Sequence, residues 1–251
     1  MSDLKFAVEN NPFLSIRELA LASSKISVII PTLNEEAMIG QTLRRLAKHK
    51  PDEIIIADGG SKDRTIQIVR DFPARVGVIA SPRGRARQMN AGARVATGNI
   101  LVFLHADSEL PTCGLEKVRS VIGQGKAKGG KFRLRFQPET LRLKLYASYT
   151  RFQFFSYGDQ AFFVHKDLFD AMGGFREDVP FEDIDFYTRL RKKTKPAILP
   201  DHVITSSRRF QKEGIAKQKW INFWLVLLYY LGFDVGHLKD HWYTDVRERT
   251  G

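Results

Sequence analysis

Acidic side chains stand within three residues of the ends of two apolar runs of the sequence, at points where a strand would leave a sheet. Asp107 follows the run at 101–104, and Asp58 follows the run at 54–57. Runs of this length are typical of strands buried on both faces of a parallel sheet. Open parallel sheets bind ligands at the carboxyl ends of their strands, so both carboxylates are candidates for one ligand site. The alternative for Asp107 is a turn residue, or the cap of a helix expected from Pro111 onwards.

Two further segments carry charges that suit a phosphorylated ligand. The basic stretch 83–87 leads into a helix expected at 88–96, and arginines beside a helix N-terminus suit a phosphate or a ribose. A solvated basic turn is the alternative. Glu182, Asp183 and Asp185 open a later helix, where acids are favoured even without a catalytic role. Helical geometry turns these acids to different faces, so they cannot all reach one ligand.

The elements that must position these residues alternate between strand and helix in the first half of the chain. Strands are expected at 26–30, 53–57, 76–79 and 101–104, and helices at 35–48, 64–71 and 88–96. Asn34 or Thr32 is expected to cap the first helix, with Glu35 and Glu36 at its positive end. The alternation predicts an α/β fold with a parallel sheet covered by helices on both faces.

The pattern changes after a helix expected at 115–122. The stretch 129–136 alternates apolar and basic residues, which predicts a half-exposed, antiparallel strand. The remaining expected elements are a helix at 139–155, a strand at 161–164, a short helix at 166–172 and short strands at 197–200 and 203–205. The sheet is therefore expected to be mixed and mainly parallel.

Composition limits the class of protein. The 251 residues carry a formal net charge of +12, which attracts the phosphates of nucleotides, nucleic acids or anionic lipids. The single cysteine, Cys113, excludes an internal disulfide and a cysteine-based metal site, and it fits a reducing cytoplasm. The sequence has no recognisable secretory signal and no apolar stretch of the ~20 residues that span a bilayer.

An apolar helix is expected at 215–233. It is too short to span a membrane, so we expect it either to pack on the main domain or to lie at a membrane surface. Lys212, Lys217 and Lys219 near its start suit anionic headgroups. The expected organisation is an N-terminal arm at 1–24, a main domain at 25–212, and this helix with a polar tail at 213–251.

The order and spacing of five motifs resemble the family 2 glycosyltransferases. The motifs are PTLNEE at 31–36, DGGSKDRT at 58–65, GRARQMNAG at 84–92, FLHAD at 103–107 and ED at 182–183. The third and fourth are more narrowly similar to a bacterial subgroup, the arsenosugar-type glycosyltransferases. The resemblance implies the GT-A fold and an inverting transfer of a sugar from a nucleotide-diphospho-sugar, with a lean toward uridine. The implied acceptor is a hydroxyl group on a small or lipid-linked molecule.

The resemblance also implies which residues bind the donor. Thr32, Glu35 and Asp58 would hold the base and ribose of the nucleotide. Arg85 and Asn90 match family positions that lie near the nucleotide. The enzyme would act in the cytoplasm, with contact to the inner face of the cell membrane as an option and with no nucleic-acid partner.

The remaining implied roles concern the transfer itself. Asp183 would be the general base that takes the proton of the acceptor hydroxyl, and Asp159 and Glu182 would line the pocket for the acceptor or the donor sugar. Asp107 matches the last carboxylate of the D-x-D element that binds Mg²⁺ or Mn²⁺. His105 departs from the family pattern, because it stands where the first carboxylate of that element is expected.

Two other functions fit part of the sequence. A basic nucleic-acid or anionic-lipid binding module without catalysis would explain the charge, but it gives no use to Asp107 and Asp183, and the chain has no nucleic-acid motif. A nucleotidyltransferase of the same fold would also need a metal and a diphosphate leaving group. Such enzymes usually carry a glycine-rich loop with Arg and Lys after the first strand, which 31–36 does not provide.

Overall fold

The computed structural model describes residues 24–152, 158–179 and 181–206, together with Trp224, Leu228 and Phe233. The arm expected at 1–24 lies outside the described residues except for Ser24, and the helix expected at 215–233 lies outside them except for three positions. Within the described ranges, no helix has the length and hydropathy needed to cross a membrane.

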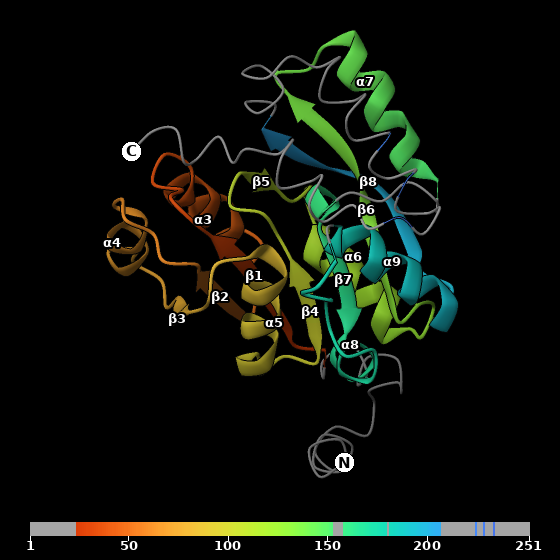
Figure 1. Ribbon diagram of the computed structural model, residues 1–251, viewed down its shortest axis with the longest axis horizontal. Coiled ribbons are helices and arrows are strands. Elements are labelled where there is room, and N and C mark those ends of the chain that lie inside the picture. The colour runs from red at the N-terminus through yellow and green to blue at the C-terminus, as the bar shows by residue number, and fades with distance from the viewer. Residues whose placement is uncertain are drawn as a thin grey trace, which may run out of the picture.

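A single mixed sheet runs through the described part of the chain (Figure 1). Its strands are β1 (Ile26–Thr32), β2 (Glu53–Asp58), β3 (Gly77–Ala80), β4 (Ile100–Phe103), β5 (Ser108–Glu109), β6 (Gly129–Gln137), β7 (Phe162–His165) and β8 (Ala197–Ser206). They lie in the order β3–β2–β1–β4–β7–β6–β8–β5. The first four are parallel, β7 is antiparallel to both neighbours, and β6 is parallel to β8. The prediction of a mixed, mainly parallel α/β sheet is confirmed.

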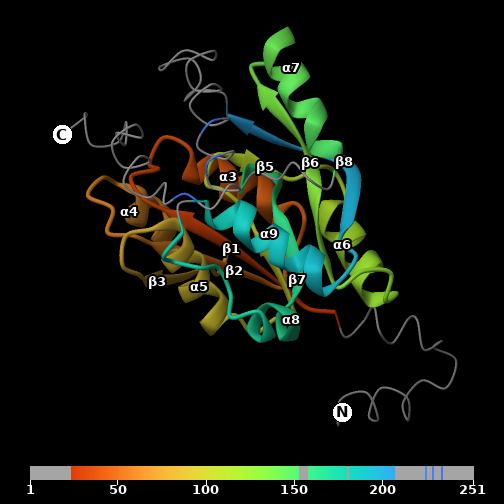
Figure 2. The ribbon, with the colours of Figure 1, turned by 45° about the vertical axis from the view of Figure 1, so that its right-hand side comes forward.

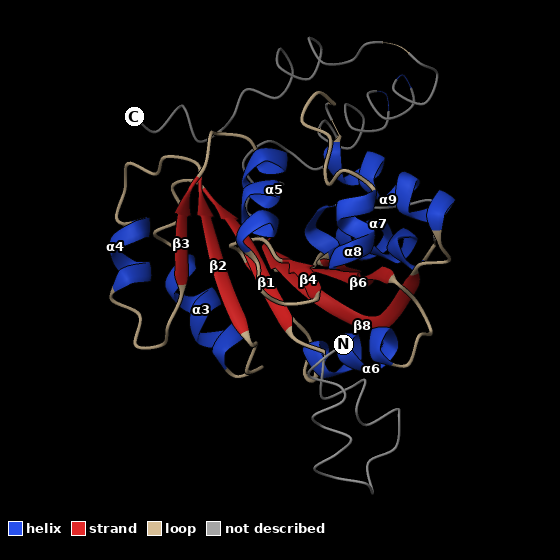
Figure 3. Ribbon diagram, turned by 90° about the horizontal axis from the view of Figure 1, so that it is seen from below, coloured by secondary structure: helices blue, strands red, loops and turns tan. Residues whose placement is uncertain are grey.

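Helices cover both faces of this sheet (Figure 3). One face carries α3 (Ile39–Ala47), α4 (Thr65–Arg70) and α6 (Gly114–Gly123), and the other carries α5 (Arg85–Val95), α8 (Lys166–Ala171) and α9 (Glu182–Lys193). A further helix, α7 (Leu141–Ser148), packs on β6 and continues as the 3₁₀ turn η1 (Tyr149–Arg151). A second 3₁₀ turn, η2 (Gly158–Gln160), precedes β7.

The central strands are buried on both faces, as their continuous apolar runs predict. In β1, Val28 and Ile30 pack into the core on the α3 side, whereas Ile29 packs into the core on the α5 side. Helix α5 approaches β1 closely at Gly92, where a Cβ atom would collide with the Ile29 side chain. The absence of that atom lets the helix lie directly over the middle of β1.

The first helix begins later than the sequence predicted. Helix α3 starts at Ile39 after Met38, with no side-chain cap, so Thr32 and Asn34 do not cap it. Thr32 is the last residue of β1, and Asn34 has a left-handed backbone with φ of 53°. The polar side chains of 32–36 are instead available to the loop that follows β2.

Helix α5 begins three residues before the expected start. Gly84, with φ of 134°, directly precedes it, and few other residues adopt that conformation. Arg85 and Arg87 therefore lie in the first turn of the helix and not in a loop.

The second half of the chain differs from expectation in three places. The two short strands expected at 197–205 are one strand, β8, with an irregular register opposite Phe132 and Arg133. Pro200 is tolerated because β5 pairs with Ile204 and Thr205, so among the described strands no ladder partner faces the proline on that side. The helix expected at 139–155 is regular only to Ser148 in its described part. Strand β6 is antiparallel to β7, as predicted, but parallel to β8.

Candidate active site

The carboxyl ends of β1 and β2 bring Thr32 and Asp58 together. The two residues pair in register, and the Thr32 hydroxyl donates to Asp58 Oδ1 at 3.2 Å. Asp58 Oδ2 accepts hydrogen bonds from the backbone N–H groups of Gly60 and Ser61, both at 2.9 Å. The Ser61 hydroxyl donates to Asp58 Oδ1 at 2.5 Å. Asp58 is thus a buried carboxylate that shapes its own loop at the sheet edge.

The loop after β1 and the loop after β2 are joined by reciprocal hydrogen bonds. The Asn34 N–H donates to Ser61 Oγ, and Asn34 Oδ1 accepts from the Lys62 N–H at 2.8 Å. The N–H of Glu35 donates to the Thr65 hydroxyl at 2.7 Å, so a half-buried Glu35 is fixed beside the same edge. Glu35, Thr32 and Asp58, which the sequence predicted as one group, therefore lie on neighbouring bonded segments.

Asp63 completes this junction. Burial raises the pKa of its carboxyl, but hydrogen bonds from the Thr65 hydroxyl and N–H and from the Glu36 N–H outweigh that effect and hold the pKa below its usual value. Such a carboxylate stays ionised at neutral pH and keeps accepting these hydrogen bonds.

Gln88 connects helix α5 to the same strand ends. Its Nε2 donates to the carbonyl of Thr32 at 2.7 Å and to the carbonyl of Ala57 at 2.8 Å. The side chain is buried, and its atoms lie against Gly59, where a Cβ would be crowded. The sequence analysis missed this residue. The one feature of the sequence that could have indicated Gln88 is a polar residue on the inner face of the expected helix, within the motif 84–92.

Four side chains from four different segments form a continuous polar chain, which we call the Arg85 chain. Arg85 Nε lies 2.6 Å from Glu182 Oε1 at the start of α9, and Arg85 Nη1 lies 3.5 Å from His105 Nε2 in the loop after β4. His105 Nδ1 lies 2.6 Å from Asp159 Oδ1 in η2. Three residues predicted at the site from separate parts of the sequence, Arg85, Asp159 and Glu182, are thereby brought together.

The chemistry of the Arg85 chain follows from its donors and acceptors. A His105 ring that donates from Nδ1 to Asp159 has a lone pair on Nε2, which can accept an N–H of Arg85. Glu182 is nearly inaccessible to solvent, and a carboxylate in that position needs a partner such as the Arg85 guanidinium. The Arg85 side chain as a whole is 37% exposed, so it can also meet an anion from solvent.

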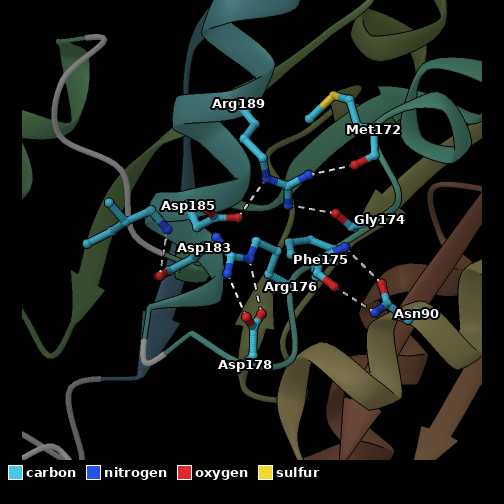
Figure 4. Close-up of polar contacts among 10 residues, drawn as sticks. Asn90, Met172, Gly174, Phe175, Arg176, Asp178, Asp183, Asp185 and Arg189 are labelled. Atoms are coloured by element: carbon cyan, nitrogen blue, oxygen red, sulfur yellow. Dashed lines mark hydrogen bonds and ion pairs between the residues drawn. The ribbon is translucent and has the colours of Figure 1, made fainter. Parts of the chain in front are cut away.

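Asp107 and Asp183 are carried by segments that the Arg85 chain holds at the site. Asp107 is half-buried and lies two residues after His105, and Asp183 is half-buried and directly follows Glu182. Asp183 Oδ1 accepts the N–H of Ile184 at 2.8 Å in the first turn of α9 (Figure 4). Among the described residues, no group of three or more His, Cys, Asp or Glu side chains could hold a metal ion.

Asn90, predicted near the nucleotide, has its amide engaged by the turn after α8. Asn90 Nδ2 donates to the Phe175 carbonyl at 2.8 Å, and Asn90 Oδ1 accepts the Phe175 N–H at 2.9 Å (Figure 4). Arg189 holds the same turn from α9, because it donates to the carbonyls of Met172 and Gly174 at 2.8 and 2.7 Å. Asp185 accepts from Arg189 Nε at 2.7 Å. Asp185 and Asn90 thus have clear structural partners.

Lys131 of β6 is buried next to η2, although the alternation of the sequence predicted that it would lie on the exposed face of the strand. Lys131 Nζ donates to the Phe152 carbonyl at 3.2 Å and lies 3.5 Å from Gln160 Oε1 and 4.5 Å from the centre of the Tyr187 ring. Gln160 Nε2 in turn donates to the Phe132 carbonyl at 2.9 Å. Burial, and then the charge of Arg191, lower the pKa of Lys131 to about 7. This packing supports the turn that carries Asp159.

Comparison with known protein families identifies the family of this chain. The family model described as glycosyl transferase family 2 matches residues 27–179, more than half of the chain. The chain is a family 2 glycosyltransferase. This membership makes it an enzyme, and the predicted family is confirmed.

Relatives of this family 2 glycosyltransferase match it in part. A PGL/p-HBAD biosynthesis glycosyltransferase of Mycobacterium bovis is 35% identical over 112 residues, which cover 41% of this chain and 44% of the relative. An undecaprenyl-phosphate 4-deoxy-4-formamido-L-arabinose transferase of Pseudomonas aeruginosa is 30% identical over 47% of this chain and 38% of that protein. The chain therefore covers less than half of the length of these relatives.

Solved structures show the same fold. TarS of S. aureus, solved in complex with UDP-GlcNAc, matches with a TM-score of 0.61 and 20% identity, over 73% of this chain and 59% of that chain. Glucosyl-3-phosphoglycerate synthase of Mycobacterium tuberculosis, solved with Mn²⁺, UDP and glucosyl-3-phosphoglycerate, matches with a TM-score of 0.51 and 20% identity, over 78% and 76%. The predicted GT-A fold is confirmed for this glycosyltransferase.

Proposed function

We propose that this glycosyltransferase moves a sugar from a uridine-diphospho-sugar to a hydroxyl acceptor in a single displacement that inverts the anomeric centre. The observation that carries this proposal is the Arg85 chain. It joins the Glu182–Asp183 motif, the start of α5 and the loop of His105 and Asp107 at the sheet edge where Thr32 and Asp58 also lie. In open α/β sheets that edge is where nucleotides bind.

The donor would lie across the ends of β1 and β2. Thr32, Glu35 and Asp58 face that edge from two loops already fixed by their mutual hydrogen bonds, which reduces the ordering cost of binding the base and ribose. The Arg85 side chain, partly exposed in the first turn of α5, would contact the diphosphate. Asn90 would act by holding the turn at Phe175 and not by touching the nucleotide.

The acceptor hydroxyl must lose a proton as it attacks the sugar carbon. Asp183 would take that proton, because its carboxylate is half-buried and belongs to the helix turn that follows the Arg85 contact. Glu182 and Asp159 would line the pocket beside it, where Glu182 keeps Arg85 oriented and Asp159 keeps the His105 ring oriented. Attack opposite the leaving diphosphate in one step gives inversion.

A divalent cation, Mg²⁺ or Mn²⁺, fits this site with Asp107 as its protein carboxylate. Such ions are commonly held by one or two carboxylates together with substrate phosphates, so a site with one carboxylate can serve. His105 is less suited as a ligand in this arrangement, because its two nitrogens face Asp159 and Arg85. When bound, the ion would neutralise charge on the leaving diphosphate. Two structural neighbours were solved with Mn²⁺ and a guanosine or uridine diphosphate ligand, which supports this choice.

The acceptor and location are finer parts of the proposal. The proposed acceptor is lipid-linked and lies at the inner face of the cell membrane; the similarity to an undecaprenyl-phosphate 4-deoxy-4-formamido-L-arabinose transferase supports the lipid-linked acceptor. Membership of the arsenosugar-type subgroup is supported by the motifs at 84–92 and 103–107.

Calorimetric titration with UDP and GDP, with Mn²⁺, with Mg²⁺ and with chelator, tests the donor and the metal. We expect tighter binding of UDP than GDP, and a loss of metal-dependent tightening in Asp107→Ala. Wild-type UDP binding that is unchanged by chelator would overturn the metal role. A thermal-shift panel of UDP-sugars then identifies the sugar, and release of nucleotide without any sugar transfer to an acceptor would contradict the transferase assignment.

A further inference from the structure

Helix α7 has an apolar face that is open to solvent. Leu141, Leu145, Tyr149 and Phe152 have exposed fractions of 75, 58, 51 and 47%. The four-residue spacing of Leu141, Leu145 and Tyr149 places these three along one side of α7 and η1, and Phe152 directly follows η1. The other side of the helix is already used, because Leu143 and Ala147 are buried against Leu134 and Phe136 of β6. We call the exposed set the α7 outer face.

Basic side chains lie on the side of α7 that borders β6. A hollow of about 190 Å³ between β6 and α7 is lined by Arg133, Arg135, Lys144 and Arg151, and Glu139 is the one acid among its described lining residues. The Arg151 guanidinium lies 5.1 Å from the centre of the Phe152 ring, so a cation stands beside the apolar row itself. The pKa of His202, which also lines the hollow, is lowered by burial and then by Arg135 and Arg133. The local charge at neutral pH therefore comes from the arginines and the lysine.

The topology places the α7 outer face at the same edge of the sheet as the Arg85 chain. Strand β7 is antiparallel to β4, and β6 is antiparallel to β7, so β6 runs in the same direction as β4. The chain enters α7 directly from the carboxyl end of β6, just as the loop of His105 leaves the carboxyl end of β4. Figures 1 and 2 show that α7 lies alongside the C-terminal half of β6, where both elements stand out from the body of the molecule.

We propose that the α7 outer face docks on the surface of an anionic lipid bilayer. A helix with exposed Leu, Tyr and Phe on one side and Arg and Lys beside them is the pattern of an interfacial helix, in which the apolar side chains enter the headgroup boundary. The basic residues then meet lipid phosphates, and each such contact near an anionic surface adds to the attraction. A second copy of this chain is a poorer occupant, because each copy carries a formal net charge of +12.

Flotation with vesicles tests this proposal without any need for catalytic activity. The full chain is mixed with vesicles of pure phosphatidylcholine, or of phosphatidylcholine with one-third phosphatidylglycerol, at low and high salt. We expect binding to the anionic vesicles that weakens at high salt. Leu141→Ser with Leu145→Ser should lower the partition coefficient at least tenfold. The matched control is Val78→Ser with Val95→Ser, two exposed apolar residues away from α7, which should bind as the wild type does.

Each other outcome contradicts the proposal in a distinct way. Wild-type protein that stays in solution with anionic vesicles removes the membrane as the partner. Equal binding by the Leu141 and Leu145 double variant assigns membrane contact to another part of the chain, such as the segment at 213–251. A large fall in the melting temperature of that variant shows that its own chain covers the face. A shift from dimer to monomer in light scattering shows a second copy on it.

Discussion

At the ends of β1 and β2, short polar side chains hold backbone groups of the neighbouring loop, whereas on the α9 side of the site long charged side chains make the equivalent contacts. Asp58 accepts from N–H groups two and three residues further along its own loop, and Asn34 accepts from an N–H group of that same loop. Arg189 and Lys131 reach carbonyls from other elements across the core. The donor edge is thus fixed by short side chains bonded to nearby loop groups, and the α9 side depends on long cationic side chains.

This contrast separates binding from chemistry, and the largest expected effect lies on the α9 side. Asp183→Asn keeps the shape of the side chain but removes the base, so kcat should fall by about 10²–10⁴-fold. The Kd for UDP, measured by calorimetry, should stay within about twofold because the donor edge is untouched.

The matched control for that experiment is Asp178→Asn, an exposed acid on the preceding turn that pairs with Arg176. It should leave both kcat and Kd near wild type. Loss of UDP binding in Asp183→Asn that equals the loss of rate would mean that Asp183 binds the donor and is not the base.

The buried lysine makes the α9 side sensitive to pH. The pKa of Lys131 is about 7 in the folded protein against an ordinary value of 10.5, so the folded state binds this proton more weakly than the unfolded chain does. The free energy of unfolding should therefore increase as the pH is raised from about 7 to about 10, by up to about 1.4 kcal/mol per pH unit. Below pH 7, Lys131 should contribute no further dependence on pH.

Urea unfolding of wild type and Lys131→Met at pH 6, 7, 8 and 9 measures that contribution. The stability advantage of Lys131→Met should be largest at pH 6–7 and shrink as the pH rises. The exposed Lys128→Met is the control and should follow wild type. A wild-type minus Lys131→Met difference that is flat with pH would show that Lys131 titrates alike in both states.

On the donor edge, Gln88 is the matching buried polar group. Gln88→Leu leaves the carbonyls of Thr32 and Ala57 without this donor, so unfolding should become easier by about 1–3 kcal/mol. The loss should not vary between pH 6 and 9. UDP should bind more weakly, because the ends of β1 and β2 are no longer tied to α5. Unchanged stability in urea would mean that other donors replace the amide.

The smallest effect on UDP binding is expected at Glu182, where the donor edge and the α9 side meet. Glu182→Gln keeps a hydrogen-bonding oxygen beside Arg85 but removes a negative charge near the proposed diphosphate position. UDP should then bind about two- to fivefold more tightly at low ionic strength, and less so at high salt. Weaker binding in calorimetry would show that Glu182 orients Arg85 for the donor in a way that the amide cannot reproduce.

How much of this could be predicted from the sequence depends on the range of the interactions. Asp58 and Asp107 were predicted at one edge because parallel strands end there, and that rule needs only the order of the strands. Gln88 was missed because its two acceptors lie 31 and 56 residues away, which no local pattern encodes. Lys131 was predicted to be exposed from the alternation of β6, but α9 covers the first part of that strand face, with Tyr187 against the lysine. The acids of α9 were separated correctly, since helical geometry alone sends Glu182 and Asp185 to different partners.

The turn at 172–175 has a consequence for how the site can move. Asn90 of α5 and Arg189 of α9 both hold this turn, while Arg85 and Glu182 join the same two helices nearer their N-termini. The two helices are therefore linked at two positions along their length, once through the turn at 172–175 and once through the Arg85–Glu182 ion pair. If substrate draws α9 inward, α5 and the turn have to travel with it, and the wall of the site would shift as one block.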